Sequence, residues 1–297
     1  MRPATDRRPR PARPRARKRF GQHFLEAVWA RKVVEAIHPQ PGDAFIEIGP
    51  GPGAITRPLA AAAGAVVACE IDRDLAAALR DEQLPHVVVV EGDFLTMSIE
   101  TLREALAASA PDATSFRVAG NLPYNVASPI MFRLVELARL GLPLADATVM
   151  LQREVADRLL AQPGTADYGL LTVLLGHRAR VSRLLNLPPG AFRPAPKVRS
   201  TVVRLAFHDA NPPVRDEALL AAVTAAVFSR RRKTMNNALL AFGGVTPASS
   251  ARALAIADVD PSRRPETLSR AELCRVADAI ASYSGGNTGR AAVPPVL

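Results

Sequence analysis

The sequence has no long apolar run and little cysteine. Of 297 residues 48% are hydrophobic, which is ample for a packed core. No uninterrupted apolar stretch reaches the roughly 18 residues that a membrane span needs, and no apolar segment of the secretory type opens the chain. Cys69 and Cys274 lie far apart and have no metal-ligand spacing. These absences argue against a membrane protein and a metal site, and we expect a reduced, cytoplasmic protein of one large or two moderate domains.

Acidic residues are scarce toward both ends of the chain. Residues 1–19 hold nine Arg or Lys and one Asp, residues 20–180 hold 13 basic and 19 acidic residues, and residues 181–297 hold 16 basic and 8 acidic ones. The net charge of +10 is therefore concentrated at the two ends. This distribution indicates a bound polyanion, and a mildly acidic middle that tolerates a cationic ligand. The alternative is a charged tail together with ordinary solvated helix faces.

Residues 1–17 alternate Arg with Pro and Ala and show no apolar periodicity. We expect this basic tail to be disordered. Its Arg-rich, acid-poor composition is also typical of a transit peptide, but Pro3, Pro9, Pro11 and Pro14 oppose the amphipathic helix that a transit peptide needs. Residues 284–297 are expected to form a second disordered tail.

From Ala44 onward the chain alternates short β-like runs with helical stretches. This βαβα order requires a mostly parallel sheet covered on both faces, and apolar runs such as Val87–Val90 fit strands that are buried on both sides. The expected fold class is α/β with a Rossmann-like sheet. The predicted strands are Ala44–Ile48, Ala65–Glu70, Val87–Glu91, Phe116–Ala119 and Ala147–Leu151, and the predicted helices are Ile55–Ala63, Asp74–Gln83, Ile99–Ala108 and Pro129–Arg139.

The character of the sequence changes after about residue 185. Proline-rich segments at 187–189 and 192–196 predict a stiff connector, because each proline fixes φ and removes a donor. We interpret residues 192–196 as structural. A strand over Ser200–Phe207 follows, and then helical stretches over roughly 215–228, 230–242 and 269–282. The chain is therefore divided into a first domain over residues 18–195 and a small, mostly helical domain over residues 196–283.

A Gly-rich turn, Gly49–Ala54, lies between the first predicted strand and its helix. It satisfies the G-x-G-x-x-A pattern of dinucleotide sites, which alone is a weak signal. Pro50 and Pro52 lack the N–H groups that a pyrophosphate needs. Glu47, just before the turn, would repel phosphate but suits a sulfonium. The turn therefore favours S-adenosylmethionine, with glycine needed for close backbone approach.

Two further carboxylates end the second and third predicted strands. Glu70 lies 21 residues after Gly49, at a level where a carboxylate accepts ribose hydroxyls in doubly wound nucleotide sites. Asp93 can accept the hydrogens of an adenine amine. Because open α/β sheets bind ligands at the carboxyl ends of their strands, acids at three successive strand ends favour a nucleoside site over solvated loop residues.

Asn121, Leu122, Pro123 and Tyr124 directly follow the fourth predicted strand. An exocyclic adenine amine is a poor nucleophile, because its lone pair is delocalised into the ring, so methyl transfer needs acceptors for its N–H bonds. The Asn121 side-chain oxygen and the Leu122 carbonyl can accept them, Pro123 stiffens the turn, and Tyr124 offers a π-face for a flipped-out base. Positioning for in-line attack then supplies most of the rate. The alternative is an ordinary proline-containing turn with an exposed aromatic side chain. Because the segment directly follows a strand of the predicted sheet, we interpret it as the catalytic segment of an RNA adenine-N6 methyltransferase.

On these residues the chain resembles a known family, the small-subunit (16S) ribosomal RNA adenine N6,N6-dimethyltransferases. The resemblance spans roughly residues 17–280 and includes both the order and the spacing of its motifs. The matching segments are Arg17–Leu25, Glu47–Gly53, Glu70–Asp72, Glu91–Asp93, Gly120–Asn125, Met150–Val155, Tyr168–Gly169, Phe192–Ser200 and Arg231–Thr234.

The resemblance implies a Rossmann-like S-adenosylmethionine-dependent methyltransferase domain followed by a small helical domain. It implies dimethylation of two adjacent adenosines in the hairpin loop near the 3′ end of small-subunit rRNA. We expect a monomer that acts on an assembling 30S subunit without a metal. Ser229 and Asn236 depart from the residues usual in the family, which affects the expected RNA contacts rather than catalysis. By the family pattern the cofactor site is lined by His23, Leu25, Gly49, Gly51, Glu70, Asp93 and Asn121.

Four consecutive cations, Arg230, Arg231, Arg232 and Lys233, are expected at the start of a helix. Four neighbours point to all sides of a helix, so some must face solvent and can contact RNA phosphates. A solvated helix face is the alternative.

Three rival functions remain. Large-subunit rRNA adenine-N6 methyltransferases of the macrolide-resistance type typically carry Ile in place of Leu122 and lack the segment Arg231–Thr234. A non-catalytic assembly or transcription factor on the same fold has no use for the segment Asn121–Tyr124. A dehydrogenase is the weakest of the three.

Overall fold

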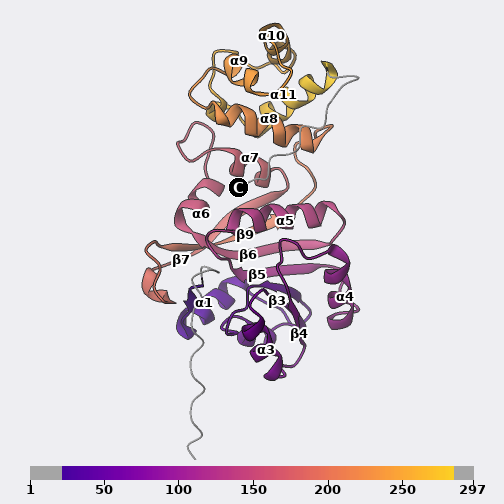
Figure 1. Cartoon of the computed structure of the whole chain (residues 1–297), viewed down its shortest axis with the longest axis vertical. Coiled ribbons are helices and arrows are strands. Elements are labelled where there is room, and N and C mark those ends of the chain that lie inside the picture. The colour runs from indigo at the N-terminus through magenta and orange to yellow at the C-terminus, as the bar shows by residue number, and fades with distance from the viewer. Residues whose placement is uncertain (1–21, 284–297) are drawn as a thin grey trace, which may run out of the picture.

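A seven-stranded sheet forms the centre of the larger part of the molecule (Figure 1). The computed structural model describes residues 22–283, so the predicted tails at 1–17 and 284–297 lie outside the described residues. The strand order is β4-β3-β2-β5-β6-β9-β7, with β2 to β6 parallel and β9 antiparallel to both β6 and β7. The strands are β2 (Ala44–Ile48), β3 (Ala65–Glu70), β4 (Val87–Glu91), β5 (Phe116–Asn121), β6 (Leu144–Gln152), β7 (Ala179–Leu187) and β9 (Ser200–Phe207).

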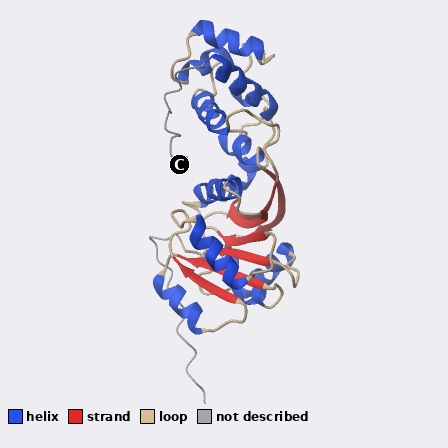
Figure 2. Cartoon of the chain, turned by 90° about the vertical axis from the view of Figure 1, so that its right-hand side faces the viewer, coloured by secondary structure: helices blue, strands red, loops and turns tan. Residues whose placement is uncertain are grey.

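Helices cover both faces of this sheet (Figure 2). They are α1 (Ala27–Ile37), α2 (Thr56–Ala60), α3 (Arg73–Asp81), α4 (Ile99–Ser109) and α5 (Ala127–Arg139). Because successive strand residues point to opposite sides, Phe45 and Val66 pack in one core with α1 and α2, while Ile46 and Val67 pack in another with α4 and α5. All four side chains are fully buried. The predicted Rossmann-like α/β fold is confirmed.

Arg117, on β5, ties the sheet to the end of α1. Its guanidinium donates to Asp43 Oδ2 at 2.7 Å and to Asp146 Oδ2 at 3.0 Å, and also to the carbonyl oxygens of Ile37 and His38. The cation thus neutralises two carboxylates and satisfies carbonyls that a helix end leaves without partners. This network holds α1 against the strands, and the segment that precedes α1 enters the candidate site described below.

The smaller part of the molecule contains helices but no strand within residues 208–283 (Figure 2). Its helices are α8 (Glu217–Ser229), α9 (Met235–Ala238), α10 (Pro247–Ile256) and α11 (Arg270–Tyr283). Val223, Leu254 and Leu273 bury their side chains in a shared core, which also takes Tyr168 and Val173. Val173 belongs to α7 (Leu170–Gly176), which follows α6 (Arg153–Leu159) and lies between the sheet and α8 (Figure 1). None of the helices in residues 22–283 is long and apolar enough to cross a bilayer.

Several expectations for the second half of the chain are not met. The strand β9 lies between β6 and β7 in the large sheet, so the predicted domain boundary between residues 195 and 196 is too early and the sheet continues to Phe207. The edge strand β7 was not predicted, because its exposed Arg180, Ser182 and Arg183 interrupt the apolar pattern. The helix expected over 230–242 is also wrong: residues 230–234 form a turn between α8 and the short α9.

Candidate active site

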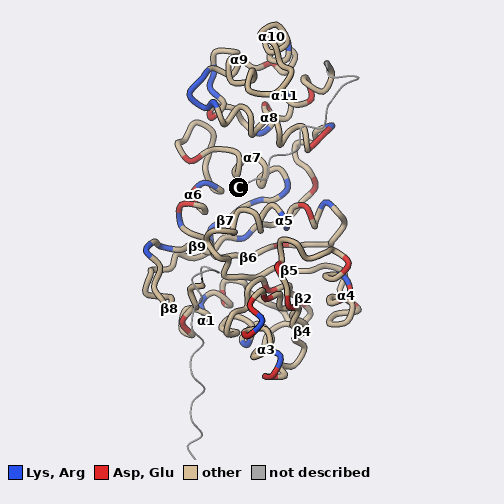
Figure 3. Tube along the Cα trace, in the orientation of Figure 1, with Lys and Arg blue, Asp and Glu red and all other residues tan. Residues whose placement is uncertain are grey.

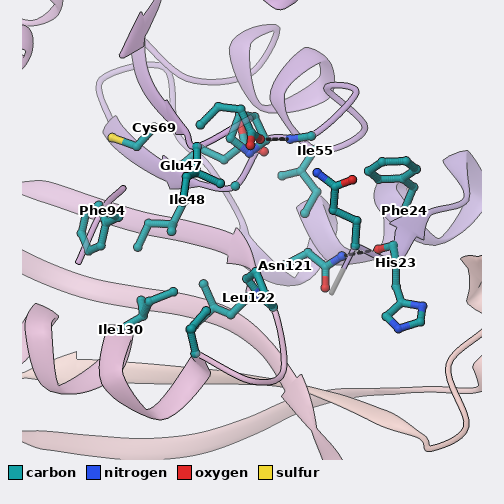
Figure 4. Close-up of a pocket in the computed structure, with 18 of the residues that line it drawn as sticks. His23, Phe24, Glu47, Ile48, Ile55, Cys69, Phe94, Asn121, Leu122 and Ile130 are labelled. Atoms are coloured by element: carbon teal, nitrogen blue, oxygen red, sulfur yellow. Dashed lines mark hydrogen bonds between the residues drawn. The ribbon is translucent and has the colours of Figure 1, made fainter. Parts of the chain in front are cut away.

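A cavity of about 260 Å³ lies at the carboxyl ends of β2, β3, β4 and β5 (Figure 4). We call it the strand-end cavity. This is where open α/β sheets bind ligands. Three carboxylates line it, and no Lys or Arg of the described chain does. All the residues predicted to bind the cofactor or to act in catalysis lie around it: His23, Leu25, Gly49, Gly51, Glu70, Asp93, Asn121, Leu122, Pro123 and Tyr124.

The Gly-rich turn has no free backbone donor over residues 49–53. Its two prolines have no N–H. The three glycine N–H groups already donate within the protein, from Gly49 to Cys69 O (2.9 Å), from Gly51 to Glu70 Oε2 (2.9 Å) and from Gly53 to Pro50 O (3.0 Å). A pyrophosphate would find no donors here. The geometry therefore argues against the dinucleotide alternative.

Glu47, near the end of β2, is a buried acid in the wall of this cavity. Its side chain is 1% exposed, and Oε2 has no hydrogen-bond partner within residues 22–283. Burial raises the pKa of Glu47 to about 7; Thr56 opposes the rise, and the nearby Glu70 carboxylate adds to it. This carboxylate is partly ionised near neutral pH, and one of its oxygens has no hydrogen-bond partner among the described residues. Such a group favours a positively charged ligand in the cavity.

Glu70 and Asp93 differ in how the protein uses them. Glu70 accepts the N–H of Gly51 at Oε2 and that of Asp72 at Oε1, the latter over 2.8 Å. Burial raises the pKa of Glu70, and these two N–H groups oppose the rise. Asp93 is exposed, and its Oδ1 accepts the N–H of Leu95 over 3.0 Å. Both carboxylates keep lone pairs for a ligand, while Glu70 also holds the Gly-rich turn in place.

Asn121 is the last residue of β5, and the protein sets the orientation of its amide. Nδ2 donates to the backbone oxygen of His23 over 2.8 Å (Figure 4). If the amide flipped, Oδ1 would face that carbonyl oxygen and the hydrogen bond would be lost. Oδ1 therefore stays available in the cavity wall as an acceptor.

The residues around Asn121 fix the backbone of the predicted catalytic turn. The Leu122 side chain is 1% exposed, and its N–H donates to Met150 O on β6. Pro123 O accepts the N–H of Val126 over 3.1 Å, which closes the turn. At Gly120 the strands approach so closely that a Cβ would lie 2.7 Å from Ile48 O. Only glycine fits there without displacing β5 from β2.

Tyr124 is held by its hydroxyl and by one ring face. Its Oη lies 2.7 Å from Ser200 Oγ on β9, and burial raises the pKa of Tyr124. Its ring stacks on that of His23 with 5.6 Å between centroids and 26° between planes. His23 Nδ1 in turn donates to Pro194 O over 2.8 Å. Residues far apart in the sequence thus position one aromatic ring at the cavity.

The proline-rich segment at residues 192–196 was expected to connect two domains, but it lies beside the strand-end cavity. Phe192–Arg193 forms strand β8, which pairs antiparallel with β1 (Phe24–Leu25) in a two-stranded ribbon. The interpretation of residues 192–196 as a connector between domains is therefore incomplete, because Pro194 contacts His23 beside the cavity. Sequence reasoning also missed the roles of Phe24 and Phe94 in the wall, although Phe94 directly follows Asp93.

The model of the family described as ribosomal RNA adenine dimethylase matches residues 13–282. This chain belongs to that family. Ribosomal RNA small subunit methyltransferase A of Aromatoleum aromaticum is 45% identical over 273 residues, which are 91% of this chain and 96% of that protein. The protein of the same name from Chromohalobacter salexigens is 43% identical over 276 residues, or 92% and 94% of the two chains. The predicted family and the methyltransferase class of enzyme are confirmed.

Two crystal structures resemble this ribosomal RNA adenine dimethylase in fold. A dimethyladenosine transferase from Plasmodium falciparum has a TM-score of 0.67 and 23% identity, covering 86% of this chain and 96% of that one. The 23S rRNA methyltransferase ErmE has a TM-score of 0.61 and 24% identity, covering 87% and 99%. The fold is therefore shared with a protein named as a dimethyladenosine transferase and with one named for 23S rRNA.

The four predicted RNA-binding cations of this dimethylase do not lie in the strand-end cavity. They lie in the turn between α8 and α9, the blue stretch beside these helices in Figure 3. Arg230, Arg232 and Lys233 are exposed, whereas Arg231 pairs with Glu266 Oε2 at 2.8 Å and donates to Ala166 O. Three of the four side chains are thus presented to solvent, and the fourth stabilises the turn.

Within residues 22–283 no group of three or more His, Cys, Asp or Glu side chains is placed to hold a metal ion. Cys69 and Cys274 are both buried and unpaired with each other. Burial raises the pKa of the Cys69 thiol to about 12. This thiol therefore stays protonated and contributes to the cavity wall as a small apolar side chain.

Proposed function

We propose that this chain transfers methyl groups from S-adenosylmethionine to the N6 amines of two adjacent adenosines in the 3′-terminal hairpin loop of small-subunit (16S) rRNA, converting each to N6,N6-dimethyladenosine. The observation that carries this proposal is the orientation of the Asn121 amide, which directs an acceptor oxygen at the end of β5. The names of relatives 40–45% identical to this chain support the small-subunit substrate.

The strand-end cavity fits S-adenosylmethionine, which supplies an electrophilic methyl group on a positively charged sulfur. The turn at Gly49–Gly53 lacks the free donors that a phosphate ligand needs. Glu47 favours a cation, because its Oε2 is buried with no hydrogen-bond partner among the described residues. Glu70 would accept the ribose hydroxyls and Asp93 the adenine amine of the donor. His23 and Leu25 would complete the wall from β1 and the residue before it.

The chain's own groups then make the target amine reactive. Asn121 Oδ1 and the Leu122 carbonyl accept its N–H bonds, so that the nitrogen lone pair is turned out of conjugation with the ring. Tyr124, held by Ser200, stacks on the base. After the first methylation one N–H remains, and a single acceptor suffices to hold the amine for the second.

Arg230, Arg232 and Lys233 are proposed to contact rRNA phosphates outside the cavity. Such contacts add affinity that falls with salt but do not select a sequence. We further propose that the substrate is rRNA within an assembling 30S subunit, and that the protein acts as a monomer in the cytoplasm. The cationic turn of the protein suits the phosphate backbone of an RNA, while the acidic strand-end cavity suits one uncharged base of that RNA.

A large-subunit rRNA methyltransferase is the second candidate. The 23S rRNA methyltransferase ErmE shares the fold, but at 24% identity it carries no weight for the substrate. Leu122 also departs from the Ile typical of the macrolide-resistance type.

One experiment separates these functions. Purified protein is incubated with methyl-labelled S-adenosylmethionine and with small or large subunits that lack the modification, and the labelled bases are mapped. We expect label on two adjacent adenosines near the 3′ end of small-subunit rRNA. Label on large-subunit rRNA alone would overturn the substrate assignment, and no label on either would overturn the enzymatic one.

A further inference from the structure

A second cavity lies between the edge of the sheet and the helical part of the molecule. It has a volume of about 690 Å³ and is lined by the end of α6, by α7, by the start of β7, by the end of β9 and by Arg270 at the start of α11. We call it the interdomain cavity. On β9, Phe207 lines it, whereas Ser200 at the other end of the strand contacts Tyr124. At roughly 3.3 Å per strand residue the two sites are about 20 Å apart.

The interdomain cavity is cationic. Arg180 and Arg270 line it, and no carboxylate of residues 22–283 does. The volume lies within the range of small-molecule sites, roughly 300–1,000 Å³. A site of this size with positive and polar walls and no acid favours an anionic ligand.

Arg270, at the start of α11, is one of the two arginines that line this cavity. Its guanidinium has no hydrogen bond or ion pair within residues 22–283, and its Nε is buried without a partner. Other arginines of this region are paired: Arg178 with Glu217, and Arg263 with Glu272. A Cβ on Gly176 would overlap Nη1 of Arg270. The absence of a side chain at Gly176 therefore leaves space for this guanidinium, and the described part of the chain supplies no acceptor for it.

Tyr168 supplies a second unused donor to the same cavity. Its side chain is 3% exposed, and its hydroxyl is buried with no hydrogen-bond partner among the described residues. Burial raises the pKa of Tyr168 to about 12, so the hydroxyl keeps its proton at neutral pH. Buried polar groups in folded proteins are normally hydrogen-bonded. A ligand that accepts hydrogen bonds would satisfy both Tyr168 and Arg270.

We propose that the interdomain cavity binds a phosphate group, with the Arg270 guanidinium and the Tyr168 hydroxyl as donors and Arg180 adding positive charge at its exposed side. A guanidinium fork matches the paired oxygens of a phosphate. Asn211, which also lines the cavity, offers a further polar side chain to the ligand. The phosphate belongs either to an RNA backbone or to a small phosphorylated molecule, and both present the same oxygens. This site is independent of the strand-end cavity.

Inorganic phosphate is the probe for the first experiment. Thermal unfolding of the full chain is followed in increasing sodium phosphate and in sodium chloride of equal ionic strength. We expect phosphate alone to raise Tm saturably, by about 2–4 °C. Arg270→Met and Tyr168→Phe should reduce this shift by at least half. The matched control is Arg264→Gln, which removes an exposed arginine of the same region that does not line the cavity and should keep the full shift.

The second experiment identifies the source of the phosphate. If RNA supplies it, Arg270→Met weakens rRNA binding five- to tenfold, and inorganic phosphate competes with RNA for the wild-type protein but not for the variant. If a small molecule supplies it, rRNA affinity is unchanged and adenosine monophosphate raises Tm as phosphate does. S-adenosylmethionine binding confirms that each variant is folded; should Arg270→Met fail this test, Tyr168→Phe takes its place. The proposal is overturned if wild-type protein shows no phosphate-specific shift, or if the folded variant keeps it in full.

Discussion

The strand-end cavity and the interdomain cavity have opposite charges. Among the described residues, the strand-end cavity is lined by Glu47, Glu70 and Asp93 and by no Lys or Arg. The interdomain cavity is lined by Arg180 and Arg270 and by no carboxylate of the same part of the chain. The exposed cations of the turn between α8 and α9 belong to the helical part of the molecule (Figure 3). A methyltransferase of RNA has to bind a cationic donor and a polyanionic substrate together. We propose that this separation of acids from cations keeps the RNA backbone away from the donor site, so that a neutral base enters the strand-end cavity.

The largest expected effect is on the rate of methylation, when Asn121 in the strand-end cavity is replaced. Asn121→Ala removes both the Oδ1 acceptor and the hydrogen bond to His23 O. Loss of one oriented polar group in an active site typically costs about 10²–10³-fold in rate, and we expect that loss in single-turnover methylation. Donor affinity, measured by calorimetry, should change far less.

Asn186→Ala is the matched control for this prediction. It removes an amide that hydrogen bonds Thr201 outside the cavity, and should leave the rate within about twofold. A rate for Asn121→Ala within tenfold of the wild type would contradict the acceptor role.

The buried Glu47 of the strand-end cavity should make the free energy of unfolding depend on pH. The pKa of Glu47 rises from 4.5 to about 7 on folding, so the folded state holds the proton more tightly than the unfolded chain. Ionising Glu47 therefore destabilises the fold: stability falls as pH rises from about 4.5 to 7, by up to about 3 kcal/mol. Glu47→Gln has no proton to lose, so its free energy of unfolding relative to the wild type should increase over this range.

Urea unfolding between pH 4.5 and 8 measures this difference. Glu35→Gln, on the exposed side of α1, provides a charge-matched control whose difference from the wild type should stay nearly constant. If the free energy of unfolding of Glu47→Gln relative to the wild type did not change with pH, ionising the buried carboxylate would not destabilise the fold, and the prediction would be wrong.

The close approach of β5 to β2 predicts a smaller loss of stability. Gly120→Ala places a Cβ against Ile48 O, and such overpacking costs about 1–3 kcal/mol. Because Asn121 follows directly, turnover should fall as well. Gly190→Ala, where a Cβ would meet no atom within 4 Å, should leave both quantities near those of the wild type; equal effects of the two substitutions would argue against the steric explanation.

The smallest effect is expected at the cationic turn. Replacing Arg230, Arg232 and Lys233 together by Ala should reduce the slope of log affinity for rRNA against log salt by about 2, at roughly 0.7 per single-strand phosphate contact. Filter binding over a range of salt concentrations measures this slope. Arg231→Ala should instead lower Tm, since it breaks the pair with Glu266. An unchanged slope for the triple variant would reject the RNA contact.

The sequence alone predicted the parts of this protein that depend on local order. The strands β2, β3 and β4 have the predicted bounds, because continuous apolar runs between turn residues predict parallel strands. The expectation that Val87–Val90 is buried on both sides is wrong, because β4 is an edge strand and these residues are only half-buried. Parallel strands bring their carboxyl ends to one edge, so Glu70, Asp93 and Asn121 could be placed together before any contact was known.

Only the tertiary structure decided what depends on distant pairings. The ribbon of β1 with β8 and the contacts of Tyr124 with Ser200 and His23 join residues more than 70 positions apart. The insertion of β9 between β6 and β7 likewise depends on pairings between separate segments of the chain. The interdomain cavity has the same origin, since Tyr168 and Arg270 meet only when the helical part packs on α7. Periodicity reports how one segment is buried, but it carries no information on which other segment buries it.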